Sequence, residues 1–284
     1  MSVRITPDLT AFEAMAPHHR VIGVHTRLRA DNLTAVGLYH QLCGTRPGTF
    51  LLESAEDGVF SRYSFVGVNA AATLSEVGGE ATWSWSGRAI AGLPSGGNPL
   101  DVLAETLRIL HTEPAPGLPP FTSGLVGYLG YDVVRRLEKL PDTNPDDLGI
   151  PELTLLLAAD VAVLDHHNGE VWLIANAINF DDSGAGVQAA HADAVARVEA
   201  MVAALLQPTA PLIAEEVSDE EPVVRRQRSP EEFQQMVRDC VEEIRAGEAF
   251  QIVASQRFEA DCDTDPLDVY RVLRRTNPSP YLYL

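Results

Sequence analysis

Three polar side chains recur at alternate positions of one apolar segment, residues 250–258, where they could line a site. The segment is rich in β-branched and aromatic residues, which predicts a strand. Successive side chains of a strand point to opposite faces, so Gln251, Ser255 and Arg257 would share one face. Most of the apolar side chains would lie on the other face. The pattern indicates either the lining of a site or a solvent-exposed face.

Other residue types that support chemistry occur in less specific patterns. His18-His19 and His166-His167 are adjacent pairs rather than i, i+4 pairs, so we do not expect them to bind a metal. Gly124, Gly127 and Gly130 lack the strand-then-GxGxxG order of a dinucleotide site. We expect these glycines to allow close backbone packing instead.

The composition restricts the class of protein and its partners. The net charge of −19, from 40 acidic and 21 basic residues, argues against binding to nucleic acid or to an anionic membrane. No apolar run approaches the ~18 residues of a membrane span, and the N-terminus lacks the order of a signal peptide. The three cysteines, Cys43, Cys240 and Cys262, do not form an even-numbered disulfide framework. We therefore expect a cytoplasmic protein.

The first part of the chain mixes strands and helices, which predicts an α+β fold. Asn98 as a cap and Pro99 at the first helical position predict a helix that ends near Leu110. Asn168-Gly169 predicts a hairpin between two strands. The predicted strands cover residues 21–28, 49–52, 62–68, 72–77, 82–86, 153–165 and 170–178, and further helices cover 31–42, 133–139 and 187–206.

A second part begins after a polar stretch without periodicity, residues 207–228. Ser229 and Glu232 form a capping box around Pro230, and apolar residues recur at helical spacing, which predicts one buried helix face. Gly247 ends this helix. We therefore predict an N-terminal domain over 1–206, a linker over 207–228 and a second domain over 229–284. A last helix opens at Asp265-Pro266, with Leu267, Tyr270 and Leu273 on its inner side.

The chain ends with a turn and a strand-like run. Asn277-Pro278 and Ser279-Pro280 are typical of turns, and the apolar run 281–284 needs a sheet neighbour. We expect this strand and its domain to continue beyond Leu284. The predicted strands at 250–258 and 281–284 would then have open edges in the present chain.

Four blocks together resemble anthranilate synthase component I, the chorismate-using subunit of tryptophan biosynthesis. Each block is modest alone, but their order along the chain is hard to explain otherwise. The resemblance covers the whole chain and about the first half of the family's pattern. The blocks are Leu51-Leu52-Glu53-Ser54 with Arg62-Tyr63-Ser64-Phe65-Val66-Gly67, then 124–132, 247–258 and Asn277-Pro278-Ser279-Pro280-Tyr281.

The resemblance implies a lyase that converts chorismate and ammonia to anthranilate and pyruvate. A separate glutamine amidotransferase subunit, component II, would deliver the ammonia. The family's catalytic His and the glutamates that bind Mg²⁺ belong to later blocks, so we expect no metal ligands here and an inactive 284-residue chain. Gln251 stands where relatives that add water to chorismate have a lysine general base. Because ammonia is already nucleophilic, a neutral glutamine suffices.

The resemblance also implies feedback inhibition by tryptophan. Glu53 could accept from its ammonium, the Ser54 hydroxyl could donate to its carboxylate, and Pro280 with Tyr281 could contact its indole. Leu282 replaces the family's usual Met at similar volume, which would tune the site rather than remove it. Without the resemblance, Glu53 and Ser54 would be read as a strand end and Arg62 as a surface charge. The residues that carry over are Glu53, Ser54, Arg62, Pro280, Tyr281 and Leu282.

Two alternatives stay open. Aminodeoxychorismate synthase is a related aminating enzyme, although the pairing of the Leu-Leu-Glu-Ser and Arg-Tyr-Ser-Phe blocks favours anthranilate synthase. The chain could also be a non-catalytic fragment that binds tryptophan.

Overall fold

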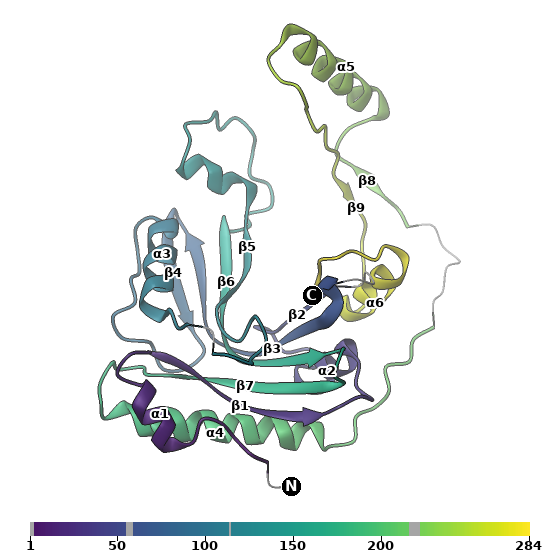
Figure 1. Cartoon of the computed structure of the whole chain (residues 1–284). Coiled ribbons are helices and arrows are strands. Elements are labelled where there is room, and N and C mark those ends of the chain that lie inside the picture. The colour runs from purple at the N-terminus through teal and green to yellow at the C-terminus, as the bar shows by residue number, and fades with distance from the viewer. Residues whose placement is uncertain (1–2, 55–58, 114, 216–221) are drawn as a thin grey trace. The chain divides into compact units, whose positions relative to one another are not determined.

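The structure is a computed structural model that describes residues 3–54, 59–113, 115–215 and 222–284 (Figure 1). The chain divides into two compact units. The first unit combines Met1–Leu212 with Tyr270–Leu284, and the second is Ile213–Val269. The C-terminal segment therefore belongs with the N-terminal unit. The functional division at 206 and 228 stays a prediction.

An antiparallel sheet of eight strands forms the framework of the first unit. Its strands run in the order β1-β7-β6-β3-β2-β10, and β4 and β5 pair with β3 and β6. The strands are β1 (Val21–Arg29), β2 (Phe50–Glu53), β3 (Tyr63–Val77), β4 (Glu80–Trp85), β5 (Leu125–Leu129), β6 (Leu153–Asp165), β7 (Glu170–Ile178) and β10 (Leu282–Tyr283). Together with the helices, they confirm the predicted mixture of helix and sheet.

Helices cover one side of β1 and β7. Helix α4 (Gly186–Leu205) packs on both strands, and α1 (Leu9–Met15) and α2 (Ala35–Leu42) pack against α4 (Figure 1). Helix α3 (Pro99–Leu110) contacts β4, and α6 (Pro266–Thr276) precedes β10. The remaining helical segments of the first unit are the 3-10 turns η1 (Val59–Arg62) and η2 (Tyr131–Arg136).

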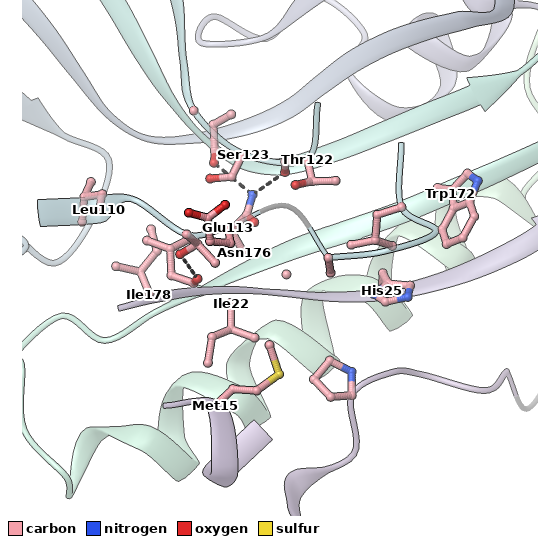
Figure 2. A pocket seen from close by; sticks show the side chains of 18 of the residues that line it. Met15, Ile22, His25, Leu110, Glu113, Thr122, Ser123, Trp172, Asn176 and Ile178 are labelled. Carbon is pink, nitrogen blue, oxygen red and sulfur yellow. Dashed lines mark hydrogen bonds between the residues drawn. The ribbon is translucent and has the colours of Figure 1, made fainter. Parts of the chain in front are cut away.

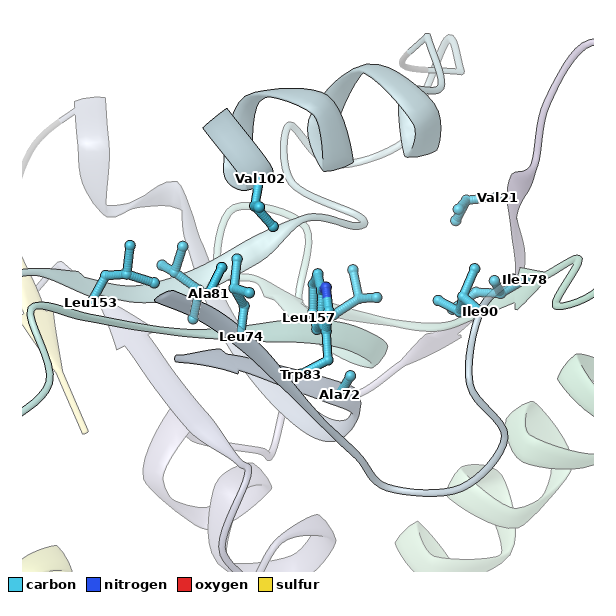
Figure 3. Packing of buried hydrophobic residues seen from close by; sticks show 11 residues of the cluster. Val21, Ala72, Leu74, Ala81, Trp83, Ile90, Val102, Leu153, Leu157 and Ile178 are labelled. Atoms are coloured by element: carbon cyan, nitrogen blue, oxygen red, sulfur yellow. The ribbon is translucent and has the colours of Figure 1, made fainter. Parts of the chain in front are cut away.

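Apolar side chains of β3, β4, β6 and α3 form one core of this unit. Leu74 and Leu153 are fully buried, and Val102 of α3 lies beside them (Figure 3). A second cluster contains Phe50 and Val161. Gly67 is required opposite Phe50, because a Cβ at this position would lie 2.1 Å from the phenyl ring.

Several local predictions are confirmed, and others need correction. Asn98 caps α3, and Gly127 lies against the backbone of Thr154, as close packing requires. Helix α2 begins later than the predicted residue 31, because the Thr34 hydroxyl accepts from the Gly37 N–H and caps the helix there. The predicted strands at 62–68 and 72–77 are one strand, since bulges keep β3 paired with β6. The segment 133–139 was predicted to be a helix. The structure has only the 3-10 turn η2 in this region, over Tyr131–Arg136.

The second unit contains helix α5 (Pro230–Ala246) and the short strands β8 (Arg225–Arg226) and β9 (Phe258–Glu259). The predicted capping box and the left-handed Gly247 are both present. The prediction of a buried α5 face is wrong, because none of its described side chains is buried.

The predicted strand at 250–258 is also wrong, apart from its last residue. Residues 251–257 have no strand partner among the described residues, and strands need neighbours to be stable. Phe250 is 94% exposed and Val253 is 81% exposed. Gln251, Ser255 and Arg257 therefore do not share a strand face.

Candidate functional site

Strand β10 brings the C-terminal block beside the Leu-Leu-Glu-Ser block. Leu282 pairs with Glu53 and Tyr283 with Leu52, and Leu284 exchanges two backbone hydrogen bonds of 2.9 Å with Leu51. Strand β2 is thus the sheet neighbour that the run 281–284 was predicted to need, and β10, as the last strand of the order, keeps one open edge among the described residues. Two of the blocks that carry the family resemblance meet at the end of β2.

Glu53 is a buried carboxylate with two partners from α6. Its side chain is 2% exposed. The Tyr270 hydroxyl donates to Oε2 at 2.6 Å, and Arg274 Nε lies 3.0 Å from Oε1. Burial, together with the hydrogen bond to Glu53, raises the pKa of Tyr270 well above its usual value. Because a buried carboxylate requires hydrogen-bonding and charged partners, Tyr270 and Arg274 offset the cost of burying Glu53.

The residue after Glu53, Ser54, carries a side-chain hydroxyl. Its Oγ is buried and has no hydrogen-bond partner among the described residues. Buried hydroxyls in folded proteins are usually paired, so an unpaired one marks a position that a ligand could fill. The residues that follow, 55–58, lie outside the described ranges.

The Arg62 side chain contacts the hairpin between β6 and β7. It contacts both oxygens of Asp165, at 3.2 and 2.9 Å, and stacks 4.7 Å from the Tyr63 ring centroid. Burial alone would raise the pKa of Asp165. The Arg62 guanidinium and the backbone N–H groups of His167 and Asn168 outweigh this, so the pKa of Asp165 is lowered. Arg62 thus fixes the loop that carries His166.

His166, on this loop, lies in the electrostatic field of Glu53. Its Nε2 is 2.8 Å from Ser64 Oγ. Burial lowers the pKa of His166, and the charge of Arg274 lowers it further, while the Glu53 carboxylate opposes both. The imidazole is therefore part of the same electrostatic cluster.

The structure thus adds four residues to those that sequence analysis predicted: Ser64, His166, Tyr270 and Arg274. Tyr270 could have been found, because helical spacing placed it on the inner side of α6. Nothing in the local sequence indicates that His166 and Arg274 approach Glu53.

The other predicted residues differ in their surroundings. Pro280 and Leu282 are half-buried, whereas Tyr281 is 80% exposed. Leu273, predicted on the inner side of α6, is exposed. Gln251 belongs to the second unit, where it is exposed in irregular structure.

The described residues do not supply a metal site. No group of three or more His, Cys, Asp or Glu side chains among them could hold an ion. They therefore do not fit a bound Mg²⁺. In the described part of the chain, no helix is long and apolar enough to cross a membrane.

The chorismate binding enzyme family matches residues 49–284, so the chain belongs to this family. Within it, the chain is similar to anthranilate synthase component 1. It is 52% identical over 274 residues to the protein of that name from Mycolicibacterium smegmatis, covering 96% of this chain and 52% of the relative. The Mycobacterium tuberculosis H37Rv protein is 50% identical over 277 residues, with 96% and 53% coverage.

The fold agrees with this assignment. The crystal structure of anthranilate synthase component I from Streptococcus pneumoniae TIGR4 is 25% identical, with a TM-score of 0.63. The match covers 90% of this chain and 53% of that structure. The chain spans about half the length of the curated relatives it matches.

Proposed function

We propose that the chain is part of the aminating subunit of an anthranilate synthase. The whole protein would convert chorismate and ammonia to anthranilate and pyruvate in the first step of tryptophan biosynthesis. A component II amidotransferase would release the ammonia from glutamine, in the cytoplasm. Support comes from the similarity to proteins named anthranilate synthase component 1, which extends over 96% of this chain.

The first unit would serve as the regulatory domain that binds tryptophan. The observation that carries this proposal is the unpaired Ser54 hydroxyl beside the paired Glu53 carboxylate, with Leu282 opposite. The hydroxyl could bind the ligand's carboxylate, and Glu53 its ammonium. Pro280, Tyr281 and Leu282 would contact the indole.

The surroundings of Glu53 determine how an ammonium group could bind. Both carboxylate oxygens already have a partner. A carboxylate has about four lone-pair positions, so an additional donor can join the two present. Arg62 would act indirectly in this scheme, because its contacts hold the loop that carries His166.

The chemistry at chorismate would depend largely on residues outside this chain. Gln251 would lie at the position where water-adding relatives have a base, and as a neutral amide it would leave ammonia as the nucleophile. Mg²⁺ would be held by residues from the half of the relatives' length that this chain does not span.

A non-catalytic role is the second candidate. Glu53 and Leu282 are paired between β2 and β10, and Ser54 follows Glu53 directly. This arrangement lies within the chain itself and favours a tryptophan-binding module if the chain acts alone. The names of the relatives favour anthranilate synthase over aminodeoxychorismate synthase.

Product analysis tests the proposed reaction. The chain, and a version extended to the length of its relatives, are incubated with chorismate, ammonium and Mg²⁺. We expect anthranilate fluorescence from the extended protein and none from the 284-residue chain. Aminodeoxychorismate as the product of the extended protein, or no product at all, would contradict the proposal.

A further inference from the structure

A hollow of about 680 Å³ lies in the first unit, beside the last turns of helix α6. All of its described lining residues belong to that unit, and none of the six predicted tryptophan-site residues is among them. The lining comes from α6, from α2 with the residues before it, and from residues 209–212. A volume of this size is typical of small-molecule sites.

Positive charge is concentrated on the α6 side of this hollow. Arg271, Arg274 and Arg275 all line it, and no Asp or Glu is among its described lining residues. Side chains three and four positions apart are neighbours on a helix, so Arg274 and Arg275 both lie next to Arg271. The three guanidinium groups thus border one space, in a protein whose net charge is −19. Because like charges at this spacing repel each other, an anion between them would be stabilising.

Contacts within the protein orient two of these arginines. Arg274 Nε lies 3.0 Å from Oε1 of Glu53, whose side chain is 2% exposed. A guanidinium has five N–H donors in one plane, so the pair with Glu53 orients Arg274 and leaves its Nη groups for a ligand. The Arg274 side chain is itself 44% exposed, so a ligand can reach it. Arg271 Nη2 donates to the Leu212 carbonyl at 2.8 Å, which holds Arg271 against residues 209–212.

The wall opposite in sequence, from α2 to residues 209–212, is also held by the protein itself. Gln41 of α2 lines the hollow, and its Nε2 donates to three backbone carbonyls at and just after the end of α4. The acceptors are Ala204, Leu205 and Gln207, at 3.1, 3.1 and 3.0 Å. A preformed wall reduces the ordering that a ligand would otherwise impose.

The larger cavity of the first unit lacks such an arrangement of charge. It has a volume of about 980 Å³, and β1, β7, α3 and the described residues of the loop after α3 line it (Figure 2). Much of this lining is apolar, as Met15 and Ile22 illustrate, and its described Arg and Glu residues are Arg4, Arg27 and Glu113. These residues come from three different segments and include both signs of charge, so they do not form a cluster of like charge.

We propose that the hollow beside α6 binds the phosphate group of a small phosphorylated molecule. A phosphate monoester carries about two negative charges near pH 7 and three acceptor oxygens, which suits several guanidinium groups better than a single carboxylate does. Arginine binds phosphate through two parallel N–H···O bonds, and the contact with Glu53 fixes the plane in which Arg274 can form them. Asn32 and Thr34 supply neutral polar side chains for the rest of the molecule.

Titration calorimetry of the full chain with inorganic phosphate tests the predicted chemistry. Acetate, an oxyanion with a single charge, is the matched probe, and sodium chloride keeps the ionic strength equal because salt screens exposed charges. We expect saturable binding of phosphate and at least about tenfold weaker binding of acetate. Phenyl phosphate, a phosphate monoester, should bind at least as tightly as inorganic phosphate. No saturable phosphate binding, equal affinities for phosphate and acetate, or weaker binding of phenyl phosphate would overturn the proposal.

Matched arginine variants localise the site. Arg275→Gln removes one exposed guanidinium of the hollow and should weaken phosphate binding about tenfold. Arg245→Gln removes an exposed guanidinium of α5, outside the described lining, and should change nothing. In NMR spectra of the unmodified chain, phosphate should shift the backbone amide signals of Thr34 and Gly37, which line the hollow. Equal affinities of the two variants, or unshifted signals at both positions, would place the phosphate elsewhere and reject the site.

Discussion

Helices α5 and α6 are both amphipathic, yet they are used differently. Helix α6 buries Tyr270 and holds Glu53 through Tyr270 and Arg274, and the segment after it pairs with β2. No described side chain of α5 is buried, and the segment after it lacks a strand partner over 251–257. An amphipathic pattern thus does not by itself supply the surface on which a helix packs.

The same contrast applies to ion pairs. The Arg62–Asp165 pair in the first unit has a carboxylate that is 2% exposed, and backbone N–H groups also donate to it. The Arg225–Asp261 pair in the second unit joins two exposed side chains. Substitutions in the first unit should therefore affect stability far more than matched substitutions in the second.

The largest effect is expected from the core of the sheet. Leu51 of β2 is fully buried, so Leu51→Ala should lower the free energy of unfolding by about 3 kcal/mol through lost burial and a cavity. Val241→Ala on the partly exposed face of α5 should cost less than about 1 kcal/mol. Urea unfolding of both variants checks the comparison, and equal losses would contradict it.

A somewhat smaller effect is expected at Glu53. Glu53→Ala leaves the buried Tyr270 hydroxyl and Arg274 without their shared partner, which should cost about 2 kcal/mol or more. Glu242→Ala, which removes an exposed partner of Arg245 on α5, is the control and should cost less than about 0.5 kcal/mol. If both variants unfold at the wild-type urea concentration, the buried cluster does not stabilise the fold.

The smallest stability effect should depend on pH. The pKa of Asp165 is lower in the folded protein than in the unfolded chain. Its pair with Arg62 therefore stabilises the fold above the unfolded pKa of about 3.9, and this contribution is lost as the pH falls through the folded pKa. Because Arg62 is half-exposed, we expect a contribution of about 1 kcal/mol at pH 7.

Urea unfolding of Asp165→Asn between pH 7 and pH 3 tests this expectation. The variant should be less stable than the wild type at pH 7, and the difference should shrink as the wild-type carboxyl becomes protonated. Arg225 also lowers the pKa of Asp261, but both side chains are exposed, so Asp261→Asn should show a pH dependence of the same sign and smaller size. A difference for Asp165→Asn that stays constant down to pH 3 would contradict the assigned ion pair.

Local signals in the sequence were sufficient to predict the helix ends. Asn98 caps α3, and Ser229 with Glu232 caps α5, because the groups that stabilise these ends lie within a few residues. The pairing of Leu282 with Glu53 could not be predicted from the residues alone, because it joins segments far apart in the chain. For the same reason, the segment 250–258 has strand-like composition but forms almost no strand.

In the candidate site, too, some residues could be predicted from the sequence and others become apparent only in the folded structure. The family resemblance supplied Glu53 and Ser54, and their proposed roles are still to be tested. It supplied neither Arg274 nor His166, whose positions depend on how α6 and the β6–β7 hairpin approach β2. Ser64 was quoted as part of a block, yet its contact with His166 follows only from the folded sheet.

The most direct test of the proposed tryptophan site is the tryptophan inhibition midpoint of Ser54 variants. These are measured at fixed chorismate in a chain extended to the length of its relatives. Ser54→Ala removes one hydrogen bond to a charged group, worth roughly 1.5 to 3 kcal/mol, so the midpoint should rise by about tenfold or more while turnover stays nearly normal. Ser54→Phe should raise it further because its larger side chain would occupy the space of the ligand, and Ser84→Ala, at an exposed serine of β4, should leave the midpoint unchanged. An unchanged midpoint in both Ser54 variants, with normal activity, would remove Ser54 from the site and contradict the account.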